Sequence, residues 1–153
     1  MKKITAILVF ICICSTGVFA QDSEKEAVQK TIESFFDGFH KQDSVHIKSL
    51  VREGTVLQTI GMNRQGQITL KTDDFSAFLK GIVSIPETMK FEEKIKSYNI
   101  QVDGAMANAW TEYEFWVNDK MSHCGVNSFQ LYNDGSGWKV IYLIDTRRQE
   151  GCN

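Results

Sequence analysis

Two residues in the second half of the chain have side chains that commonly transfer protons. His123 lies in the stretch KMSHCGVNSF, and Asp145 lies in the stretch YLIDTRR near the C-terminus. An imidazole and a carboxylate can act as general acid and general base when a partly apolar site adjusts their pKa values. We therefore predict His123 and Asp145 as candidate catalytic residues. The alternatives are that His123 is a structural histidine and that Asp145 is a strand-end cap or half of an ion pair.

The adjacency of His123 and Cys124 raises the question of a metal site, or of a nucleophile with its base. Both residues fall in a predicted strand, where neighbouring side chains point to opposite faces, so the two cannot act together. His40 and His46 lack the four-residue spacing that places two imidazoles on one helical face. The sequence also contains no glycine-rich phosphate loop and no nucleophile elbow. We therefore predict no metal site and no cofactor.

The residues opposite His123 follow from the turn that precedes it. Asn and Asp at positions 118–119 are typical of a two-residue hairpin turn. Counting outward from this turn places Glu114 opposite His123 and Trp110 opposite Asn127. One face of the hairpin then holds Trp110, Glu112, Glu114, His123 and Asn127, and the other holds Thr111, Tyr113, Phe115, Cys124, Val126 and Ser128. The charged face lines a pocket in one interpretation and is solvent or dimer surface in the other.

The final predicted strand, WKVIYLIDTRR, carries Asp145 together with the basic residue Arg147. Alternation places Trp138, Val140, Tyr142 and Ile144 on one face, and Ile141, Leu143, Asp145 and Arg147 on the other. Asp145 and Arg147 are two residues apart in the sequence and can form an ion pair. The candidate ligand-binding residues are Trp110, Tyr113, Glu114, Asn127 and Arg147.

The first twenty residues predict a secretory signal peptide. The basic start MKK precedes an apolar run at residues 4–13, and Val18 and Ala20 occupy the positions that a signal peptidase reads. The run is shorter than a membrane-spanning helix needs, although an uncleaved anchor is the alternative. We expect cleavage after Ala20, export to the periplasm or out of the cell, and no stable membrane anchor afterwards.

The remaining residues, 21–153, predict a single globular domain. The whole chain has a formal net charge of −2, and removing the leader removes two lysines and no acid. Basic residues are scattered and are not interleaved with aromatic residues, so we expect no nucleic-acid partner. One proline, with no repeat and no low-complexity tract, gives no sign of a linker or of a second domain.

The cysteines divide between the leader and the domain. Cys12 and Cys14 leave with the signal peptide, so Cys124 and Cys152 remain in an exported chain. Two thiols in an oxidising compartment usually pair, and we predict a disulfide that contributes on the order of 3 kcal/mol to stability. The alternative is that both cysteines are unpaired.

Helices in the first half are predicted from capping residues and apolar spacing. Ser23 and Glu26 form a capping box at the start of a long amphipathic helix. Asp43 can begin a short second helix, and Asp73 can cap a third helix that ends before Pro86.

Strands make up the rest of the predicted domain. Residues 54–72 predict a strand, a turn at 63–66 and a second strand. Residues 90–147 predict four strands joined by turns that carry Asn, Asp and Gly. We therefore predict an α+β fold, in which three helices from the N-terminal half pack on a curved, mostly antiparallel sheet of about six strands.

The segment HCGVNSFQLYNDGSGWKVIYLIDTRRQEGC, together with this order of elements, resembles small secreted bacterial members of the nuclear transport factor 2-like superfamily. The resemblance covers essentially the whole chain after the leader. It implies a cone-shaped α+β barrel with an internal pocket, often a homodimer formed through the sheet, and it fits a Cys124–Cys152 pairing. The superfamily includes isomerases, dehydratases, polyketide cyclases, transport adaptors and proteins without a known ligand, so it implies no single reaction.

We predict an exported protein that binds a small molecule of unknown identity in the pocket of this fold. Aromatic residues available to line the pocket are Phe35, Phe39, Phe75, Phe78, Trp110 and Trp116. The first alternative is an enzyme of the isomerase, dehydratase or cyclase type, in which His123 transfers a proton beside Glu114 or Asp145. Asn127 or Tyr113 would then donate to a developing oxyanion. The second alternative is a dimeric structural or interaction domain.

Overall fold

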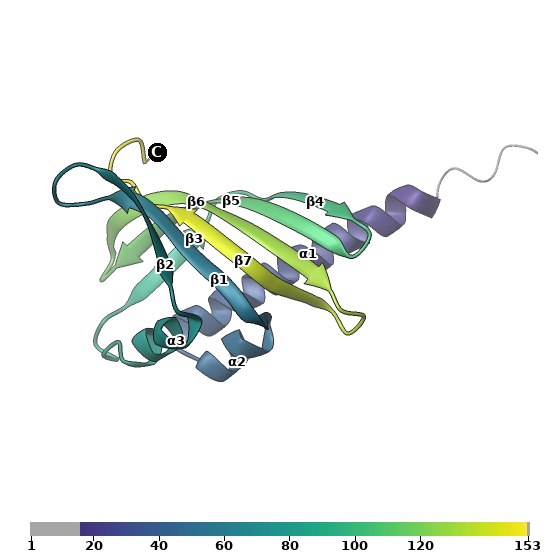
Figure 1. Cartoon of the computed structure of the whole chain (residues 1–153), viewed down its shortest axis with the longest axis horizontal. Helices are drawn as coiled ribbons and strands as arrows, with labels where there is room; N and C mark the ends of the chain where they lie inside the picture. Colours follow the sequence, from purple (N-terminus) through teal and green to yellow (C-terminus); the bar gives the residue numbers. More distant parts are fainter. Residues whose placement is uncertain (1–15, 153) are drawn as a thin grey trace, which may run out of the picture.

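A curved sheet arches over a long helix in the computed structural model, which describes residues 16–152 (Figure 1). The helices are α1 (Thr16–His40), α2 (Ser44–Ser49) and α3 (Phe75–Val83). The strands are β1 (Val51–Met62), β2 (Ile68–Asp73), β3 (Phe91–Ile95), β4 (Asn99–Asp103), β5 (Met106–Val117), β6 (Lys120–Asn133) and β7 (Trp138–Thr146). Residues 1–15 of the predicted leader lie outside the described residues. No helix within residues 16–152 is long and apolar enough to cross a membrane.

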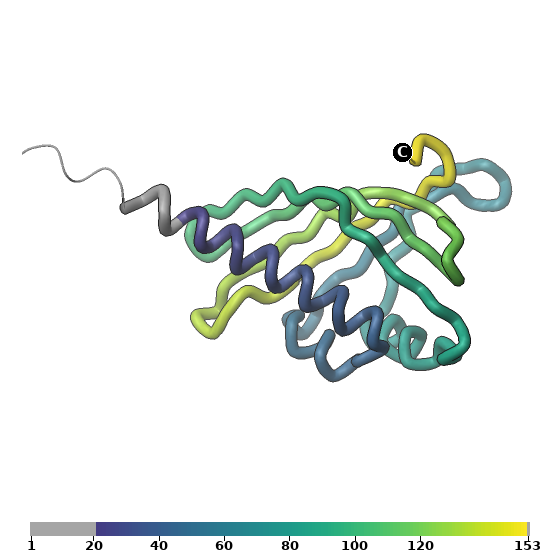
Figure 2. The backbone as a smooth tube through the Cα atoms, turned by 180° about the vertical axis from the view of Figure 1, so that it is seen from behind, coloured from purple at the N-terminus to yellow at the C-terminus, as the bar shows by residue number. Residues whose placement is uncertain are grey.

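The strands of the described chain form one sheet in the order β2-β1-β7-β6-β5-β3, and β4 also pairs with β5. Neighbouring strands are antiparallel except β1 and β7, which run parallel. Helix α1 runs along one face of the sheet, with α2 and α3 at one end (Figures 1 and 2). We call this the concave face and the opposite one the outer face. The predicted α+β fold, with N-terminal helices on a curved and mostly antiparallel sheet, is confirmed.

The described sheet has seven strands because one predicted strand is divided. The segment at 90–103 forms β3 and β4, which pair with the two ends of β5. β5 has 12 residues, and the two short strands have five residues each, so both fit along the same neighbour. The prediction of four strands between residues 90 and 147 is therefore wrong by one strand.

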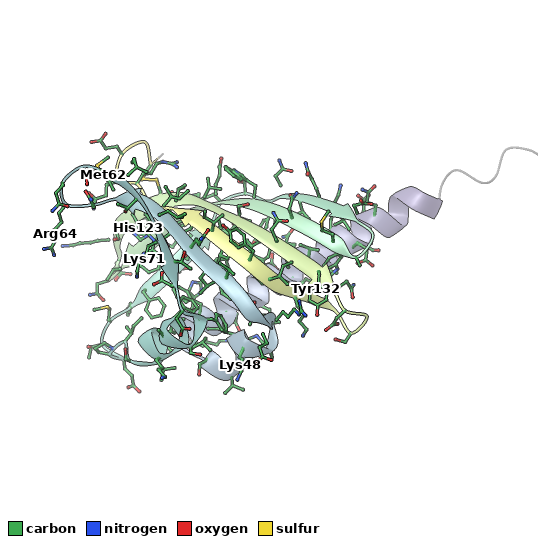
Figure 3. The ribbon with its side chains drawn as sticks, in the orientation of Figure 1. Lys48, Met62, Arg64, Lys71, His123 and Tyr132 are labelled. Carbon is green, nitrogen blue, oxygen red and sulfur yellow. A yellow bond between two sulfur atoms is a disulfide. The ribbon has the colours of Figure 1, made fainter. Side chains whose placement is uncertain are left out.

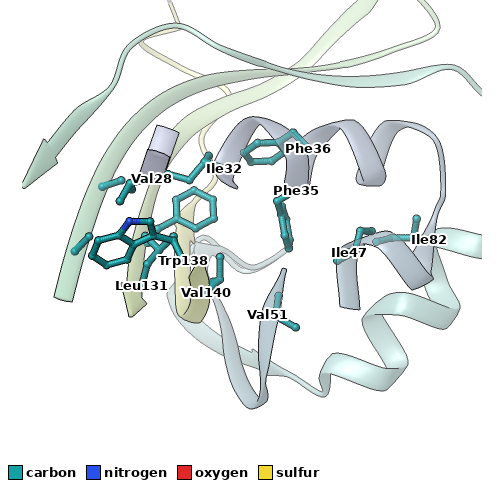
Figure 4. Close-up of a cluster of buried hydrophobic side chains, with 13 residues drawn as sticks. Val28, Ile32, Phe35, Phe36, Ile47, Val51, Ile82, Leu131, Trp138 and Val140 are labelled. Atoms are coloured by element: carbon teal, nitrogen blue, oxygen red, sulfur yellow. The ribbon is translucent and has the colours of Figure 1, made fainter. Parts of the chain in front are cut away.

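Apolar side chains of α1 fill the concave face (Figure 4). Val28, Ile32 and Phe35 are at most 2% exposed and belong to one cluster with Phe129 and Leu131 of β6. The rings of Phe35 and Phe129 meet edge to face, with 6.2 Å between their centroids. Burying side chains of this size stabilises the fold by about 1.5–3 kcal/mol each, so the predicted apolar stripe of this helix attaches it to the sheet.

Two helix starts differ from the predicted ones. Helix α1 already begins at Thr16, so Ser23 lies inside it and the predicted capping box does not start it. Asp74 caps α3, accepting a backbone N–H of the first turn at 2.8 Å. Asp73 cannot take that role because it is still paired with β1 as the last residue of β2. The prediction for α2 is confirmed, since Asp43 is its N-cap.

The hairpin between β5 and β6 contains an extra residue. Its turn at 118–119 forms as predicted, with positive φ at both positions. Trp116 pairs with Met121, but the next pair skips Ser122, which forms a β-bulge. Alternation of side chains along a strand gives no sign of such a residue, so counting outward from the turn fails beyond it.

The bulge moves every later pair of this hairpin by one residue. His123 lies opposite Phe115 rather than Glu114, and Asn127 lies opposite Thr111. A one-residue shift exchanges the two faces, so the predicted grouping of side chains is wrong. The concave face holds Thr111, Tyr113, Phe115, His123 and Asn127, and the outer face holds Trp110, Glu112, Glu114, Cys124, Val126 and Ser128.

A second bulge interrupts β7. The pairing of β7 with β6 skips Ile141, which lies between Val140 and Tyr142. Val140 and Asp145 consequently share the concave face, whereas uninterrupted alternation predicted opposite faces for them. This bulge brings Asp145 to the same side of the sheet as the apolar core.

A disulfide joins Cys124 to Cys152, with 5.7 Å between their Cα atoms. Cys124 and Arg148 also exchange two backbone hydrogen bonds of 3.0 Å, so the tail continues alongside β6. The predicted disulfide is confirmed, and the alternative of two unpaired cysteines is wrong. Both a covalent bond and backbone pairing therefore hold the C-terminal segment.

Candidate functional site

Asp145 lies in a hydrogen-bond network on the concave face. Its carboxylate accepts hydrogen bonds from the hydroxyl of Thr59 at 2.5 Å and from the hydroxyl of Tyr113 at 3.1 Å. Nε of Arg147 lies 2.8 Å from the same carboxylate, which confirms the predicted ion pair. Asp145 is only 9% exposed, and both of its oxygens have partners. The geometry suits Asp145 to hold Tyr113 and Arg147 in place.

Tyr113 is held between this carboxylate and the backbone of β7. Its hydroxyl lies 2.9 Å from the carbonyl oxygen of Thr146. The close approach depends on Gly125, because a Cβ there would lie 1.8 Å from that carbonyl oxygen and 2.9 Å from the tyrosine ring. Burial raises the pKa of Tyr113, and the charge of Asp145 raises it further. Tyr113 is therefore a neutral hydrogen-bond donor at physiological pH.

Glu93 of β3 belongs to the same cluster, and sequence reasoning missed it. Nδ2 of Asn127 donates to Oε1 of Glu93 at 2.7 Å. Burial raises the pKa of Glu93 to about 7; the hydrogen bond from Asn127 opposes this shift, and the charge of Asp145 adds to it. A signal was present in the strand FEEKI, where Glu93 alternates in phase with Phe91 and Ile95 and so occupies an apolar position.

His123 lies at the end of the sheet near the β1–β2 turn, away from Tyr132 (Figure 3). Its ring stacks on Phe115 with 4.9 Å between centroids, and it meets the ring of Tyr113 edge-on at 5.9 Å. Nδ1 lies 3.2 Å from the hydroxyl of Ser122. Burial lowers the pKa of His123, and the positive charge of Arg147 lowers it further. The imidazole is therefore neutral at neutral pH.

The structure does not bring all the predicted site residues together. Trp110 and Glu114 lie on the outer face, where Glu114 accepts a hydrogen bond from Trp116 at 3.0 Å and pairs with Lys96 at 3.2 Å. Trp110 is 52% exposed. The predicted contact of Glu114 with His123 is wrong because of the bulge at Ser122. The concave face does bring together His123, Tyr113, Asn127, Asp145 and Arg147.

Several polar atoms of this cluster have no hydrogen-bond partner within residues 16–152. The hydroxyl of Thr111 is fully buried and unpaired. Oε2 of Glu93 and Nε2 of His123 are also without a partner in that part of the chain. Buried and half-buried polar groups normally have partners. The cluster therefore retains hydrogen-bonding capacity that the protein itself does not use.

Aromatic rings lie beside this polar cluster. The ring of Phe39 lies 6.3 Å from that of Phe78 and 6.3 Å from that of Phe115, between centroids. Phe75 is partly buried next to Phe78, whereas Phe35 belongs to the closed core. Of the aromatic residues predicted to line a pocket, Phe39, Phe75 and Phe78 are thus near the cluster. The two tryptophans predicted with them are on the outer face.

An open groove of about 420 Å³ lies at the β3 edge of the sheet. It is lined by His40, Lys90, Phe91, Glu92, Lys94, Trp116, Asn118 and Asp119. Apart from Trp116, which was predicted as part of a pocket wall, none of the residues selected from the sequence lines it. The groove therefore adjoins the concave-face cluster through Phe91, whose ring contacts those of Phe39 and Phe115, but it contains none of the polar residues of the cluster.

No protein-family model and no curated protein matches the sequence. Solved structures do match. A nuclear transport factor 2-like protein of unknown function from Shewanella baltica has a TM-score of 0.60 and 16% identity, over 84% of this chain and 97% of that chain. A candidate dehydratase of the same family from Streptomyces avermitilis has a TM-score of 0.63 and 12% identity, over 83% and 97% of the two chains.

A third similar structure is the beta subunit of a candidate aromatic-ring-hydroxylating dioxygenase from Novosphingobium aromaticivorans. Its TM-score is 0.68 with 11% identity, over 86% of this chain and 94% of that chain. Identities this low carry no function from one protein to another. The backbone agrees along most of each chain, however, with the same cone of sheet and helices. This chain therefore has the nuclear transport factor 2-like fold.

Proposed function

We propose that this chain is an exported protein that binds a small molecule at the end of the concave face that holds Glu93 and His123. The observation that carries the proposal is the pair of polar atoms without a hydrogen-bond partner in residues 16–152, Oε2 of Glu93 and Nε2 of His123. A ligand with polar groups would form hydrogen bonds with these two atoms in place of water.

The surroundings favour a ligand with an apolar body and a polar head. Rings of Phe39, Phe78 and Phe115 lie beside the polar cluster, and small-molecule sites usually combine apolar walls with a few placed polar groups. The side chain of Arg147 is 55% exposed and Asp145 holds it by an ion pair. A charged group of the ligand therefore meets a fixed cation at the rim of the cluster.

Binding is tested on protein that begins at Gln21 and is produced in an oxidising compartment. Native mass spectrometry would reveal a retained molecule, and a small-molecule library would supply ligands otherwise. Glu93→Gln should weaken binding about tenfold, because an NH2 group replaces Oε2 and can no longer accept a hydrogen bond from the ligand. Glu112→Gln, on the exposed outer face, is the matched control and should bind as the wild type does. The proposal fails if no ligand distinguishes these two variants.

Export is a separate part of the proposal and rests on the predicted leader. Expression of the full chain in a bacterial host, followed by mass spectrometry of the periplasm and medium, should find a protein whose first residue is Gln21. Recovery of the full-length chain in the cytoplasm alone would contradict export and would leave the binding proposal standing.

An acid–base enzyme acting on the same class of ligand is the second candidate function. It is favoured by the pKa of about 7 of Glu93, because a group with this pKa both gives and takes a proton near neutral pH. Glu93 would then exchange the proton, His123 would contact the substrate, and Asp145 would position Tyr113. Turnover of a bound ligand should follow one ionisation near pH 7 and should be abolished in Glu93→Gln. Binding without turnover would reject this candidate.

We further propose that the protein forms a homodimer through the outer face. Large apolar side chains there are 38–70% exposed, namely Val56, Met62, Ile68, Leu70 and Trp110. Exposed apolar groups gathered on one face commonly mark an interface. Sedimentation velocity should give the mass of a dimer for the wild type and of a monomer for Leu70→Asp. A monomeric wild type would contradict the proposal.

A further inference from the structure

The groove at the β3 edge lies beside the candidate site and uses other side chains of the same strand, including Phe91, whose ring contacts that of Phe39. Glu93 points to the concave face, whereas its neighbours Glu92 and Lys94 line the groove. The volume of about 420 Å³ lies within the range of small-molecule sites. The proposed binding function uses none of these side chains, so a function of the groove would be a separate one.

One wall of the groove is the turn between β5 and β6. The N–H of Asn118 donates to the carbonyl of Lys90 at 2.8 Å, and the side-chain oxygen of Asn118 accepts the N–H of Lys90 at 3.0 Å. Asn118 and Asp119 have φ values of 49° and 62°, in the left-handed region that asparagine and aspartate adopt more readily than other non-glycine residues. The paired hydrogen bonds to Lys90 hold this turn in place and give the groove a fixed wall.

Two further lining residues, His40 and Trp116, are also held in place. Nε2 of His40, in the last turn of α1, accepts the backbone N–H of Glu93 at 2.9 Å and so ties the helix end to β3. The indole of Trp116 donates Nε1–H to Glu114 at 3.0 Å, and the ammonium of Lys94 lies 4.4 Å from its ring centroid. The hydrogen bond to Glu114 limits the side-chain entropy that the indole loses when a ligand stacks on it. A ligand that stacks on the ring face covered by Lys94 takes the place of that ammonium group.

Charges in the groove are balanced. Lys94 lies 3.5 Å from Glu92, whereas Lys90 and Asp119 have no ion-pair partner among the described residues. A strongly anionic ligand would meet both carboxylates, and a strongly cationic ligand would meet both ammonium groups. Like charges at close range oppose binding. The lining therefore selects against ligands with a large net charge of either sign.

We propose that this groove binds a neutral saccharide. A sugar ring presents an apolar C–H face that stacks on an indole, and hydroxyl groups that both donate and accept hydrogen bonds. Trp116 supplies the indole, Asp119 accepts hydroxyl protons, and Lys90 donates to hydroxyl oxygens. The open and polar shape of the groove fits a ligand that stays partly in water. This site uses none of the side chains proposed to bind the small molecule on the concave face.

Titration of the chain that begins at Gln21 with neutral monosaccharides and disaccharides tests the proposal. Glucose, galactose, mannose, N-acetylglucosamine and their disaccharides are followed by ligand-observed NMR and calorimetry. At least one should bind saturably. Asp119→Asn should weaken it about tenfold, because a hydrogen bond to a charged group is lost. Asp134→Asn, in the β6–β7 turn away from the groove, is the matched control and should have no effect.

A second variant, at a residue outside the turn at 118–119, tests the proposal independently of that turn. Trp116→Leu should abolish saccharide binding, with the fold checked by the retained NMR spectrum of the concave-face residues. The proposal is overturned if no neutral saccharide binds, if only charged sugars bind, or if binding survives unchanged in both groove variants. Glu93→Gln should leave saccharide binding unchanged, so failure of the concave-face proposal is distinguishable from failure of this one.

Discussion

The side-chain amide of Asn127 lies 2.7 Å from the carboxyl group of Glu93, although β5 separates their two strands in the sheet. The contact is therefore made above the concave face rather than along a backbone ladder. It opposes the effect of burial on Glu93, whose pKa is still raised to about 7. Glu93 consequently changes its charge near neutral pH within a cluster that also holds the carboxylate of Asp145.

Glu93→Gln should stabilise the protein in alkaline solution. The pKa of Glu93 rises from its ordinary 4.5 to about 7 in the folded state. The protonated form therefore stabilises the fold below pH 4.5, and this contribution is lost as the pH rises through 7. Glutamine stays neutral and still accepts from Asn127. Urea unfolding at about pH 8 should show a gain of about 1–3 kcal/mol, reduced by solvent screening of the partly exposed carboxyl.

The same variant supplies its own control in acid. At about pH 4, where the carboxyl is protonated in both states, Glu93→Gln and the wild type should have nearly the same unfolding free energy. An equal effect at both pH values would show that packing, rather than ionisation, causes the difference.

Protonation of His40 should destabilise the fold in mild acid. Only the neutral imidazole can accept the N–H of Glu93 at Nε2. Burial lowers the pKa of His40 from its ordinary 6.5, against the opposing charges of Glu92 and Asp37. The stabilisation is therefore complete above pH 6.5 and is lost as the pH falls through the folded pKa. His40→Gln should flatten the pH dependence of unfolding between about pH 5 and 7, and an unchanged dependence would contradict the assignment.

Gly125→Ala should be among the most damaging single-methyl changes in the chain. The new Cβ would lie 1.8 Å from the carbonyl oxygen of Thr146, which is backbone and cannot rotate away. We expect a loss of about 3 kcal/mol in chemical denaturation, together with disruption of the Tyr113 contacts. Gly81→Ala, in α3 with nothing within 4 Å of its Cβ, is the control and should be neutral or stabilising.

Removing the disulfide should destabilise the fold without changing its topology. Cys124 and Cys152 are 28 residues apart, and a bond that closes such a loop contributes about 3 kcal/mol by restricting the unfolded chain. The Cys124→Ala, Cys152→Ala double variant should lose about this amount in urea unfolding. Wild type treated with reductant should match it. A double variant as stable as the oxidised protein would show that backbone pairing with Arg148 alone holds the tail.

Local patterns in the sequence predict most of the fold. The apolar stripe of α1, the cap at Asp43 and the turn at 118–119 each depend on residues close together in the chain, and each prediction is confirmed. The start of α1 was wrong because residues before Ser23 are helical as well. Nearby residues do not report how far a helix extends beyond a good capping sequence.

The candidate site could be predicted only in part, because its geometry depends on strand register. Asp145 and Arg147 were paired correctly because they are two residues apart. Glu114 was assigned to the wrong face because Ser122 bulges, and a bulge leaves no trace in the pattern of apolar residues. Glu93 was missed because its partner Asn127 lies 34 positions away.

The bulge at Ser122 allows two parts of the hairpin to have different strand registers. The turn sets one register for the residues beside it, and the disulfide with the packed core sets another, one residue out of step. At the level of the gene, loss of the single codon for Ser122 would leave the hairpin with only one of these two registers. Either the turn would have to change its length, or Cys124 and His123 would exchange sides. Insertions and deletions in this hairpin should therefore be tolerated in compensating pairs and not singly.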